Sequence, residues 1–372
     1  MTPKPRVVHM TSVHHPFDTR ILHKQCRSLA EVGYDVTLVV PHEADTTVDG
    51  VQIKAVRVPR NRFQRILSTT WAVYRAARRL NPAVYHFHDP ELIPVGLLLK
   101  LSGKRVICDV HEDLPRQVMS KDWILPPLRY AVSKFVDLFE RLTFRAFDRI
   151  IAAEDSYTRR LPAKKTIVVH NFPIMSEISV PDDSLPHVER EPLIFYVGAV
   201  SRIRGAVEMV QAMALLPRSL GAKLVIAGKI PPDLQTELER LPAFDSVHAP
   251  GWQSRQQMAD FLSRARVGLS VLHPSPNYLE SYPTKLFEYM TAGIPVIASD
   301  FPLWRGVVDS AGCGLLVDPE DPRAIADAIA WLLEHPDEAE AMGERGRTAV
   351  VVRYNWESES QKLLDIYADL TR

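Results

Sequence analysis

The sequence predicts an α/β protein built from two doubly wound, Rossmann-like domains. Short runs rich in β-branched residues alternate with helix-length amphipathic segments, which is the pattern of parallel sheets covered by helices. This alternation occurs twice along the 372 residues, a length that suits two domains. A stretch with four prolines and no clear periodicity, residues 171–192, lies between the two halves.

The first half is expected to form one domain over residues 1–170, followed by a linker over residues 171–191. Helices are expected to fill the gaps between its strands. The predicted strands of this half are Arg6 to Met10, Asp35 to Val40, Gln52 to Val58, Val84 to His88, Arg105 to Val110, Arg149 to Ala152 and Thr166 to His170.

The second half repeats the pattern and predicts a domain over residues 192–352. Its predicted strands are Leu193 to Val197, Lys223 to Ala227, Val247 to Ala249, Gly268 to Leu272, Pro295 to Ala298 and Gly314 to Val317. After Val317 the pattern is helical to the end, with breaks near Pro336 and around residues 354–356. The last helix, residues 357–370, need not belong to the domain that precedes it.

Charge and cysteine content exclude several classes of protein. The 45 Lys and Arg residues balance 45 Asp and Glu residues, so no net charge draws the protein toward nucleic acid. Cys26, Cys108 and Cys313 match neither a disulfide framework nor a zinc pattern. The N-terminus does not read as a signal peptide, and the longest apolar run, residues 92–99, is too short to span a bilayer. We expect a cytoplasmic protein, either soluble or bound on the inner face of the membrane.

Two glutamates, Glu280 and Glu288, are separated by seven residues. Roughly one such pair is expected by chance, so the spacing alone decides nothing. A helix that begins near Pro283 would leave Glu280 on a loop and Glu288 in an early turn. Its free N–H groups and Lys285 would then form a diphosphate site, with Glu288 near a ribose and Glu280 near a sugar. A surface helix with two solvated acids fits this stretch equally well.

Seven motifs together resemble glycosyltransferase family 4, which comprises retaining enzymes of the GT-B architecture, and within it the members that build bacterial surface polysaccharides. The motifs cover most of the chain and lie at residues 11–24, 86–91, 109–113, 197–205, 283–300, 313–319 and 354–357. The resemblance implies two domains that face each other across a cleft. It also implies that residues 353–372 form a C-terminal helix that crosses back to the first domain.

The resemblance assigns roles around the paired glutamates. Glu288 would bind the ribose, and Glu280 would approach the donor sugar. Pro283, Thr284 and Leu286, at the start of the same helix, would belong to the nucleotide-binding site.

The phosphate-binding loop departs from the family pattern. Members often carry Gly-Arg followed by Lys-Gly, whereas here Gly198 precedes Ala199, and Arg204-Gly205 replaces Lys-Gly. Arg204 would take the role of the lysine, and Arg202 could substitute for the missing arginine. A solvated loop arginine is the alternative for both.

Gly228 and Trp252 resemble the walls of the base pocket in this family, although Trp252 could equally be a packing residue. The resemblance does not distinguish UDP from GDP.

In the first domain His111 directly follows a strand, and the resemblance implies a contact with the transferring sugar or its phosphate. A structural histidine is the alternative, but the neighbouring acids Asp109, Glu112 and Asp113 favour a functional one. A metal site made by His111 with His86, His88 and Asp89 is disfavoured, since the sequence contains no Asp-x-Asp motif. No metal or other cofactor is therefore expected.

The helix from Phe63 to Arg79 places apolar residues on one face and arginines largely on the other, so it could lie on an anionic membrane. A helix that covers the sheet and has a solvated face is the alternative. The segment from Leu128 to Phe147 is ambiguous in the same way. In the first loop, which contains His14 and His15 but no glycine, an acceptor could bind.

We therefore expect a retaining, metal-independent glycosyltransferase. It would move a sugar from a UDP- or GDP-sugar to a hydroxyl of a lipid-linked or oligosaccharide acceptor in cell-envelope or exopolysaccharide synthesis. Arg202, Arg204 and Lys285 would stabilise charge on the departing diphosphate, while His111 and Glu280 hold the sugar.

Two alternatives remain open from the sequence, namely a nucleotide-sugar epimerase of the same architecture and a non-catalytic nucleotide-binding scaffold. The sequence contains no P-loop, no strand-linked G-x-G-x-x-G and no G-x-S-x-G motif, which disfavours ATPases, dehydrogenases and hydrolases.

Overall fold

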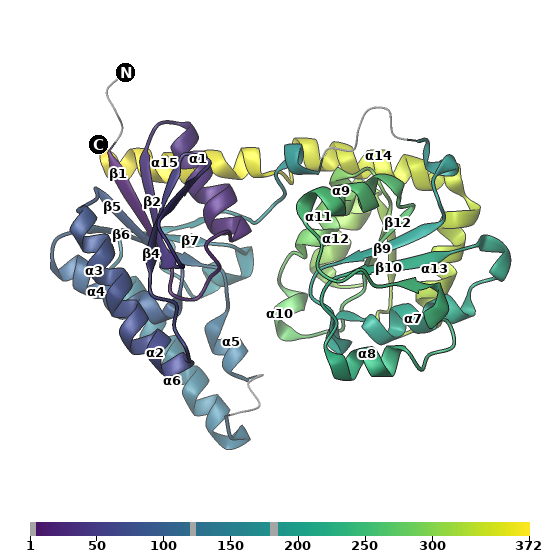
Figure 1. Ribbon diagram of the computed structural model, residues 1–372, viewed down its shortest axis with the longest axis horizontal. Coiled ribbons are helices and arrows are strands. Elements are labelled where there is room, and N and C mark those ends of the chain that lie inside the picture. Colours follow the sequence, from purple (N-terminus) through teal and green to yellow (C-terminus); the bar gives the residue numbers. More distant parts are fainter. Residues whose placement is uncertain (1–4, 120–123, 179–184) are drawn as a thin grey trace. The chain divides into compact units, whose positions relative to one another are not determined.

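The computed structural model describes residues 5–119, 124–178 and 185–372. The chain divides into two compact units (Figure 1). Unit 1 comprises Met1–Asn171 and Trp356–Arg372, and unit 2 comprises Phe172–Asn355. Each unit contains a largely parallel sheet, which confirms the predicted α/β class with two doubly wound domains. Part of the predicted linker, residues 179–184, lies outside the described residues.

The sheet of unit 1 has the strand order β3-β4-β2-β1-β5-β6-β7-β8. Its strands are β1 (Arg6–Met10), β2 (Asp35–Pro41), β3 (Thr46–Val48), β4 (Val51–Val56), β5 (Val84–Phe87), β6 (Arg105–Val110), β7 (Arg149–Ala152) and β8 (Thr166–Val168). All neighbours pair in parallel except β3 and β4. The chain reverses its direction of winding between β1 and β5, so the carboxyl ends of these two strands mark the point where such sheets bind ligands.

The antiparallel strand β3 was missing from the sequence prediction. It forms a hairpin with β4 through Asp49 and Gly50, whose φ values of 49° and 78° are both left-handed. An Asp-Gly pair is a strong hairpin signal, because both central residues of such a turn need positive φ. The strand was overlooked because it has only three residues.

Helices cover both faces of the unit 1 sheet. They are η1 (Thr19–Cys26), α1 (Arg27–Glu31), α2 (Arg62–Gln64), η2 (Arg65–Thr69), α3 (Thr70–Leu80), η3 (Pro90–Leu92), α4 (Ile93–Leu101), α5 (Leu114–Met119), α6 (Pro126–Phe144), η4 (Asp155–Arg159) and α15 (Trp356–Thr371). On one face, α3, α4 and α6 contribute to a core with alternate residues of β1, β5 and β6. The C-terminal helix α15 packs against η1, α1 and β5.

The prediction for the helix from Phe63 to Arg79 was only partly right. Its second half, α3, buries Val73 and Ala77 as expected, but Phe63 and Leu67 are 80% and 73% exposed. The intervening segment η2 is a π-helix, which turns less per residue than an α-helix and so rotates the first turn away from the sheet.

The sheet of unit 2 is entirely parallel and has the order β11-β10-β9-β12-β13-β14. Its strands are β9 (Leu193–Val197), β10 (Lys223–Ala227), β11 (Val247–His248), β12 (Val267–Ser270), β13 (Val296–Ser299) and β14 (Gly314–Val317). The winding reverses between β9 and β12. The loops after these two strands therefore mark the expected ligand site of this unit.

The helices of unit 2 are η5 (Met175–Glu177), η6 (His187–Glu189), η7 (Arg202–Arg204), α7 (Ala206–Leu215), η8 (Arg218–Leu220), α8 (Pro232–Leu238), η9 (Phe244–Ser246), α9 (Arg255–Arg264), α10 (Pro276–Leu279), α11 (Thr284–Thr291), α12 (Pro302–Ala311), α13 (Pro322–Glu334) and α14 (Pro336–Val352). The predicted breaks near Pro336 and residues 354–356 are confirmed. Among the helices in the described parts of the chain, none is long and apolar enough to cross a membrane.

Candidate donor and sugar sites

In unit 2 several of the predicted donor residues lie on helix α11, which is anchored at the reversal point of the sheet. Tyr289 of α11 bonds both strands there: it accepts from the Val197 N–H at 3.2 Å and donates to the Leu269 carbonyl at 3.1 Å. Leu286 is fully buried, so its side chain belongs to the core. This anchoring fixes the start of the helix beside the loops that follow β9 and β12.

Lys285 is a buried cation next to an aromatic ring. Its Nζ lies 3.5 Å from the centroid of the Tyr196 ring and has no hydrogen-bond partner among the described residues. Burial holds the pKa of Lys285 well below its usual range, and the nearby Arg204 lowers it further, while Glu288 acts in the opposite direction. An ammonium group in this position lacks an anion.

Two glycines, Gly198 and Gly228, lie in the loops beside this lysine, where a larger residue would be strained or would clash. A Cβ on Gly198, where φ is 118°, would lie 3.8 Å from Lys285 Nζ. A Cβ on Gly228 would lie 2.0 Å from the Gly198 carbonyl oxygen, so any larger residue there would push the two loops apart. Gly228 is therefore needed for the close packing of the two loops, and Gly198 for the left-handed backbone that places its loop next to Lys285.

Arg204 and Arg202 differ in their surroundings. The Arg204 guanidinium lies 5.6 Å from the centre of the Tyr278 ring, close enough to Lys285 to affect its pKa. Arg202 forms ion pairs with Asp233, at 3.5 Å, and with Glu237, both on α8, and its side chain is 56% exposed. Of these two arginines, only Arg204 lies near Lys285 in the described structure. Arg202 would have to break its ion pairs with α8 to contact a phosphate next to Lys285.

The two glutamates lie as the sequence predicted. Glu280 follows α10, and Glu288 is in the second turn of α11, for which Pro283 is the N-cap. Thr284, the first helical residue, is exposed. Trp252 is 78% exposed on the loop after β11, so the alternative that it packs in the core is wrong.

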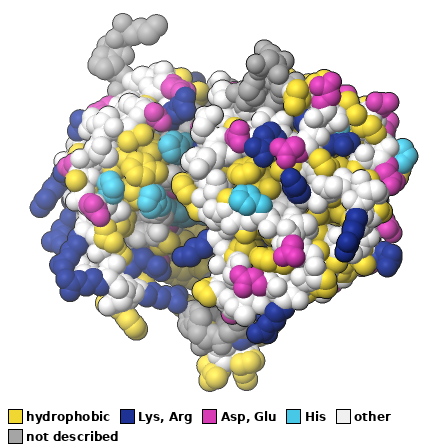
Figure 2. All heavy atoms as spheres, turned by 45° about the vertical axis from the view of Figure 1, so that its right-hand side comes forward, with side chains coloured by type: hydrophobic (Ala, Val, Ile, Leu, Met, Phe, Trp, Pro, Cys, Tyr) yellow, Lys and Arg dark blue, Asp and Glu magenta, His cyan; other side chains and the backbone are white. Residues whose placement is uncertain are grey.

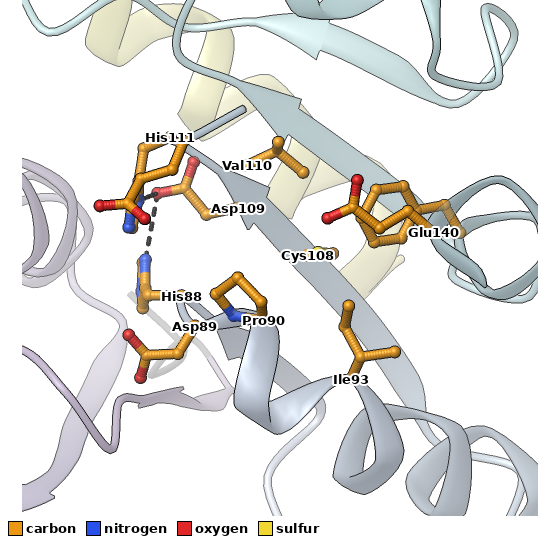
Figure 3. Close-up of a pocket in the computed structure, with 11 residues that line it drawn as sticks. His88, Asp89, Pro90, Ile93, Cys108, Asp109, Val110, His111 and Glu140 are labelled. Atoms are coloured by element: carbon orange, nitrogen blue, oxygen red, sulfur yellow. Dashed lines mark hydrogen bonds and ion pairs between the residues drawn. The ribbon is translucent and has the colours of Figure 1, made fainter. Parts of the chain in front are cut away.

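In unit 1 His111 lines a small pocket at the carboxyl ends of β5 and β6 (Figure 3). His88, Asp89 and Asp109 border the same pocket, and Glu140 of α6 closes it on the other side. The His111 Nδ1 atom lies 3.5 Å from Asp109 Oδ2.

Asp109 is a buried carboxylate surrounded by donors. Arg20 donates to both of its oxygens, at 2.9 and 2.8 Å, and Gln25 donates at 2.9 Å. His88 Nδ1 lies 3.0 Å from Oδ2. Burial by itself would raise the pKa of Asp109, but Arg20 and the two histidines hold it well below its usual range. Arg20, in the first turn of η1, is therefore a structural partner of Asp109.

His14 is the residue of the first loop that reaches this pocket. Its Nε2 atom lies 3.0 Å from His111 Nε2 and 3.3 Å from Asp89 Oδ1. Asp89 in turn accepts from the Thr11 hydroxyl at 2.8 Å. The sequence prediction placed His14 near the acceptor but did not pair it with His111, because only the sheet order makes the loops after β1 and β6 neighbours of the β5 end.

Two groups of side chains resemble metal-ligand sets. They are His9 with His86 and His88, and His88 with Asp109 and His111, and in each set the ligand atoms lie within 4.8 Å of one another. Both nitrogens of His9 and of His88 are already engaged: His9 Nδ1 lies 2.9 Å from His88 Nε2, His9 Nε2 lies 2.9 Å from the Tyr367 hydroxyl, and His88 Nδ1 lies 3.0 Å from Asp109. The charge of Arg20 next to Asp109 also disfavours a divalent cation. These residues are a poor fit for a metal.

The comparisons with known proteins agree with this architecture. A family model for a "Glycosyl transferase 4-like domain" matches residues 19–171, and one for "Glycosyl transferases group 1" matches residues 181–349. An MMP alpha-(1->4)-mannosyltransferase of Mycolicibacterium hassiacum is 24% identical over 92% of each chain. The chain spans about half the length of several other curated relatives that it matches.

Two solved structures share the fold over nearly their whole length. A sucrose-phosphate synthase from Thermosynechococcus elongatus has a TM-score of 0.78 at 20% identity, with 98% of each chain covered. HepE of Anabaena, solved in complex with UDP, has a TM-score of 0.74 at 11% identity, with 98% of this chain and 100% of that chain covered. The chain therefore belongs to the glycosyltransferases of the GT-B architecture, with a glycosyl transferase 4-like domain followed by a glycosyl transferases group 1 domain.

Proposed function

We propose that this glycosyltransferase retains anomeric configuration, needs no metal, and transfers a sugar from a UDP- or GDP-sugar to a hydroxyl of a lipid-linked or oligosaccharide acceptor. The bond between the anomeric carbon and the diphosphate oxygen breaks, and the acceptor oxygen forms the new glycosidic bond. The nucleoside diphosphate is the leaving group, and the proton of the acceptor hydroxyl passes to its terminal phosphate or to solvent. Cell-envelope or exopolysaccharide synthesis in the cytoplasm is the proposed setting. Retention and the acceptor class rest on the resemblance to family 4.

The observation that carries the proposal is the buried, unpartnered ammonium of Lys285 beside Gly198 and Arg204. A diphosphate would supply the missing anion. The two cations and the N–H groups at the start of α11 would then stabilise the charge that develops as the diphosphate leaves, the role that a metal has in other transferases. Glu288 is proposed to bind the ribose hydroxyls.

His111 and Glu280 are proposed to hold the transferring sugar. For His111 the support is its position at the mouth of a pocket lined by carboxylates, which can accept hydrogen bonds from sugar hydroxyls. For Glu280 the support is its place on the loop that leads into α11.

The test uses Glu288→Ala and Arg204→Ala, with Arg218→Ala, an exposed arginine on η8, as control. Nucleotide release from a panel of UDP- and GDP-sugars is measured with and without membrane extract as the source of acceptor. We expect each site variant to lose at least about a hundredfold in rate, as for the removal of a transition-state charge contact, and the control to lose none. Wild-type rates in both site variants would refute these assignments.

The same assay separates the alternatives. An epimerase would convert the donor to a second nucleotide sugar without acceptor and without nucleotide release. A non-catalytic scaffold would bind UDP or GDP, as seen by a thermal shift, yet release nucleotide from no donor.

We also propose that unit 1 touches an anionic membrane through its basic helices. Residues 62–79 contain five Arg residues and no Asp or Glu. The exposed Phe63 and Leu67 lie among them, and α6 adds the exposed Phe135 and Leu142 beside Lys134. Figure 2 shows Lys and Arg side chains gathered along this side of unit 1. Apolar tips framed by cations are the pattern of interfacial binding.

Vesicle sedimentation tests this contact. The double variant Phe63→Ser with Leu67→Ser should bind phosphatidylglycerol vesicles at least about tenfold more weakly, because two apolar side chains no longer enter the interface. Leu101→Ser is the control, since Leu101 is 86% exposed at the C-terminal end of α4, outside the proposed membrane-binding helices. Equal binding by both variants would refute the proposed face.

A further inference from the structure

A chain of buried polar groups runs from the C-terminal helix to the carboxylate beside His111. His86 Nδ1 lies 2.9 Å from the hydroxyl of Tyr367 on α15, and that hydroxyl lies 2.9 Å from His9 Nε2. His9 Nδ1 lies 2.9 Å from His88 Nε2, and His88 Nδ1 lies 3.0 Å from Asp109 Oδ2. All five residues are at most 4% exposed.

The pleat of the sheet assembles this chain. His9 on β1 is the register partner of His86 on β5, and side chains two residues apart on a strand point to the same face. His88 and Asp109 therefore project on the face of His9 and His86, which is the face that α15 covers. The apolar residues between them, among them Phe87 and Cys108, point to the core on the other face.

In this hydrogen-bond chain every donor points the same way, toward Asp109. Asp109, ionised and paired with Arg20, can only accept, so His88 must donate from Nδ1. Neutral His88 then accepts at Nε2 from His9 Nδ1–H, and His9 accepts at Nε2 from the hydroxyl of Tyr367. That hydroxyl has one proton, so it accepts from His86 Nδ1–H. The ionised carboxylate of Asp109 thus determines which atom donates in every hydrogen bond of the chain from His86 to Asp109.

The opposite direction is unfavourable. It would need an added proton on His88, and every link would reverse until His86 carried its proton on Nε2. That atom is buried and has no hydrogen-bond partner among the described residues. A buried N–H without an acceptor costs more than an unused lone pair on the same nitrogen. Burial also holds the pKa values of all three histidines below their usual range.

We propose that Tyr367 and His9 are positioning residues of this enzyme: their chain of donors fixes the His88 ring on Asp109, and Asp109 in turn orients His111. His111 Nδ1 lies 3.5 Å from Asp109 Oδ2, an electrostatic contact longer than a hydrogen bond, which favours the proton on Nδ1. The Nε2 lone pair of His111 can then accept from a sugar hydroxyl or from His14 Nε2, which is 3.0 Å away. The positioning role rests on the proposed contact between His111 and the sugar, whereas the hydrogen-bond chain itself does not depend on that contact.

The arrangement is tested by NMR on the full-length protein with isotope-labelled histidine. Long-range nitrogen–proton correlations at pH 7.5 report which ring nitrogen carries the proton. We expect His9, His86 and His88 all to be neutral with the proton on Nδ1. A proton on Nε2 of His9 or His88, or a charged His88, would overturn the assigned direction.

The positioning role is tested by Tyr367→Phe, which removes only the hydroxyl. The matched control is Tyr34→Phe: Tyr34 is buried, its ring lies 5.8 Å from that of Tyr367, and its hydroxyl lies 3.3 Å from Thr371 Oγ1, outside the chain. We expect Tyr367→Phe to shift the ring signals of His9, His88 and His111 and to lower kcat about tenfold, the low end of the loss seen when a residue that orients a metal-bound histidine is removed. The nucleotide KM should stay within about twofold, since those contacts are proposed in unit 2. The control should change neither.

A double-mutant cycle with His111→Ala separates positioning from general destabilisation. If Tyr367 acts through His111, Tyr367→Phe lowers kcat in the wild-type background and has no further effect when His111 is alanine. Equal effects in both backgrounds would overturn the positioning role. The probes are UDP-glucose and GDP-mannose, with nucleotide release as the readout. If His111→Ala alone keeps the wild-type rate while the NMR assignment holds, then the proposed sugar contact has failed and the hydrogen-bond chain has not.

Discussion

If a diphosphate binds at Lys285 as proposed, donor binding is coupled to protonation of this side chain. Burial lowers the pKa of Lys285 in the free protein and Arg204 lowers it further, so the side chain loses its proton more easily there than an exposed lysine does. A diphosphate next to the amine would restore the charged form, so binding should take up a proton. The affinity for the diphosphate should therefore be highest at low pH and should fall as the pH rises above the pKa of Lys285 in the free protein.

Calorimetry of UDP and GDP binding in phosphate and in Tris buffer would measure this uptake. The observed enthalpy should differ between the two buffers for the wild type, because they release the proton at different enthalpic cost. Lys285→Met should bind at least about tenfold more weakly and show no buffer dependence. Identical enthalpies for the wild type in both buffers would contradict the lowered pKa as the state of the free protein.

At the scale of elements, most strands followed from the sequence because β-branched runs bounded by turn residues are local signals. The strands β1, β6, β7, β9, β10 and β14 begin and end at the predicted residues. The π-helical segment η2 did not follow, since the residues that form it also suit an α-helix and no local signal marks the wider turn.

Helix α15 is held to unit 1 by a pH-dependent pair. Glu359 accepts from the backbone N–H of His170 at 2.9 Å, and their side chains lie 3.4 Å apart. Burial opposes both charges, yet the pairing raises the pKa of His170 and lowers that of Glu359. The His170 contribution is complete below about pH 6.5 and is lost as the pH rises through its folded pKa. The Glu359 contribution is complete above about pH 4.5 and is lost as the pH falls.

Glu359→Gln should therefore lower the free energy of unfolding by about 1–2 kcal/mol at pH 6 and by less at pH 8.5, as measured in urea. Asp365→Asn makes the same change at an exposed position of α15 and should have an effect below about 0.5 kcal/mol at both pH values. A loss of equal size at both pH values would contradict the charged pair.

At the scale of the whole molecule, unit 1 is assembled from both ends of the chain, with unit 2 inserted between them. The C-terminal residues supply Tyr367 to the buried histidines and Trp356, whose indole donates to Ser28 at 2.9 Å. Unit 2 ends at Asn355 and has its own hydrophobic cores.

Removal of residues 356–372 should accordingly destabilise unit 1 selectively. Hydrogen exchange should show faster exchange in β1 and β5, which lose the cover of α15, while β9 and β12 keep their protection. Uniformly faster exchange in both sheets would show that α15 stabilises the two units together.

The sequence by itself determined the α/β class, most strand positions, the helix that begins at Thr284 and the family motifs, because each depends on residues close together in the chain. Only the tertiary structure decided that Arg202 turns to α8, that His14 meets His111, and that Tyr367 joins His9 and His86. Those contacts depend on strand order and on the return of α15, and burial then fixes their charge states. Hydrophobic periodicity predicts local secondary structure and gives no information on contacts between polar groups. These groups become neighbours only when strands far apart in sequence pair in one sheet.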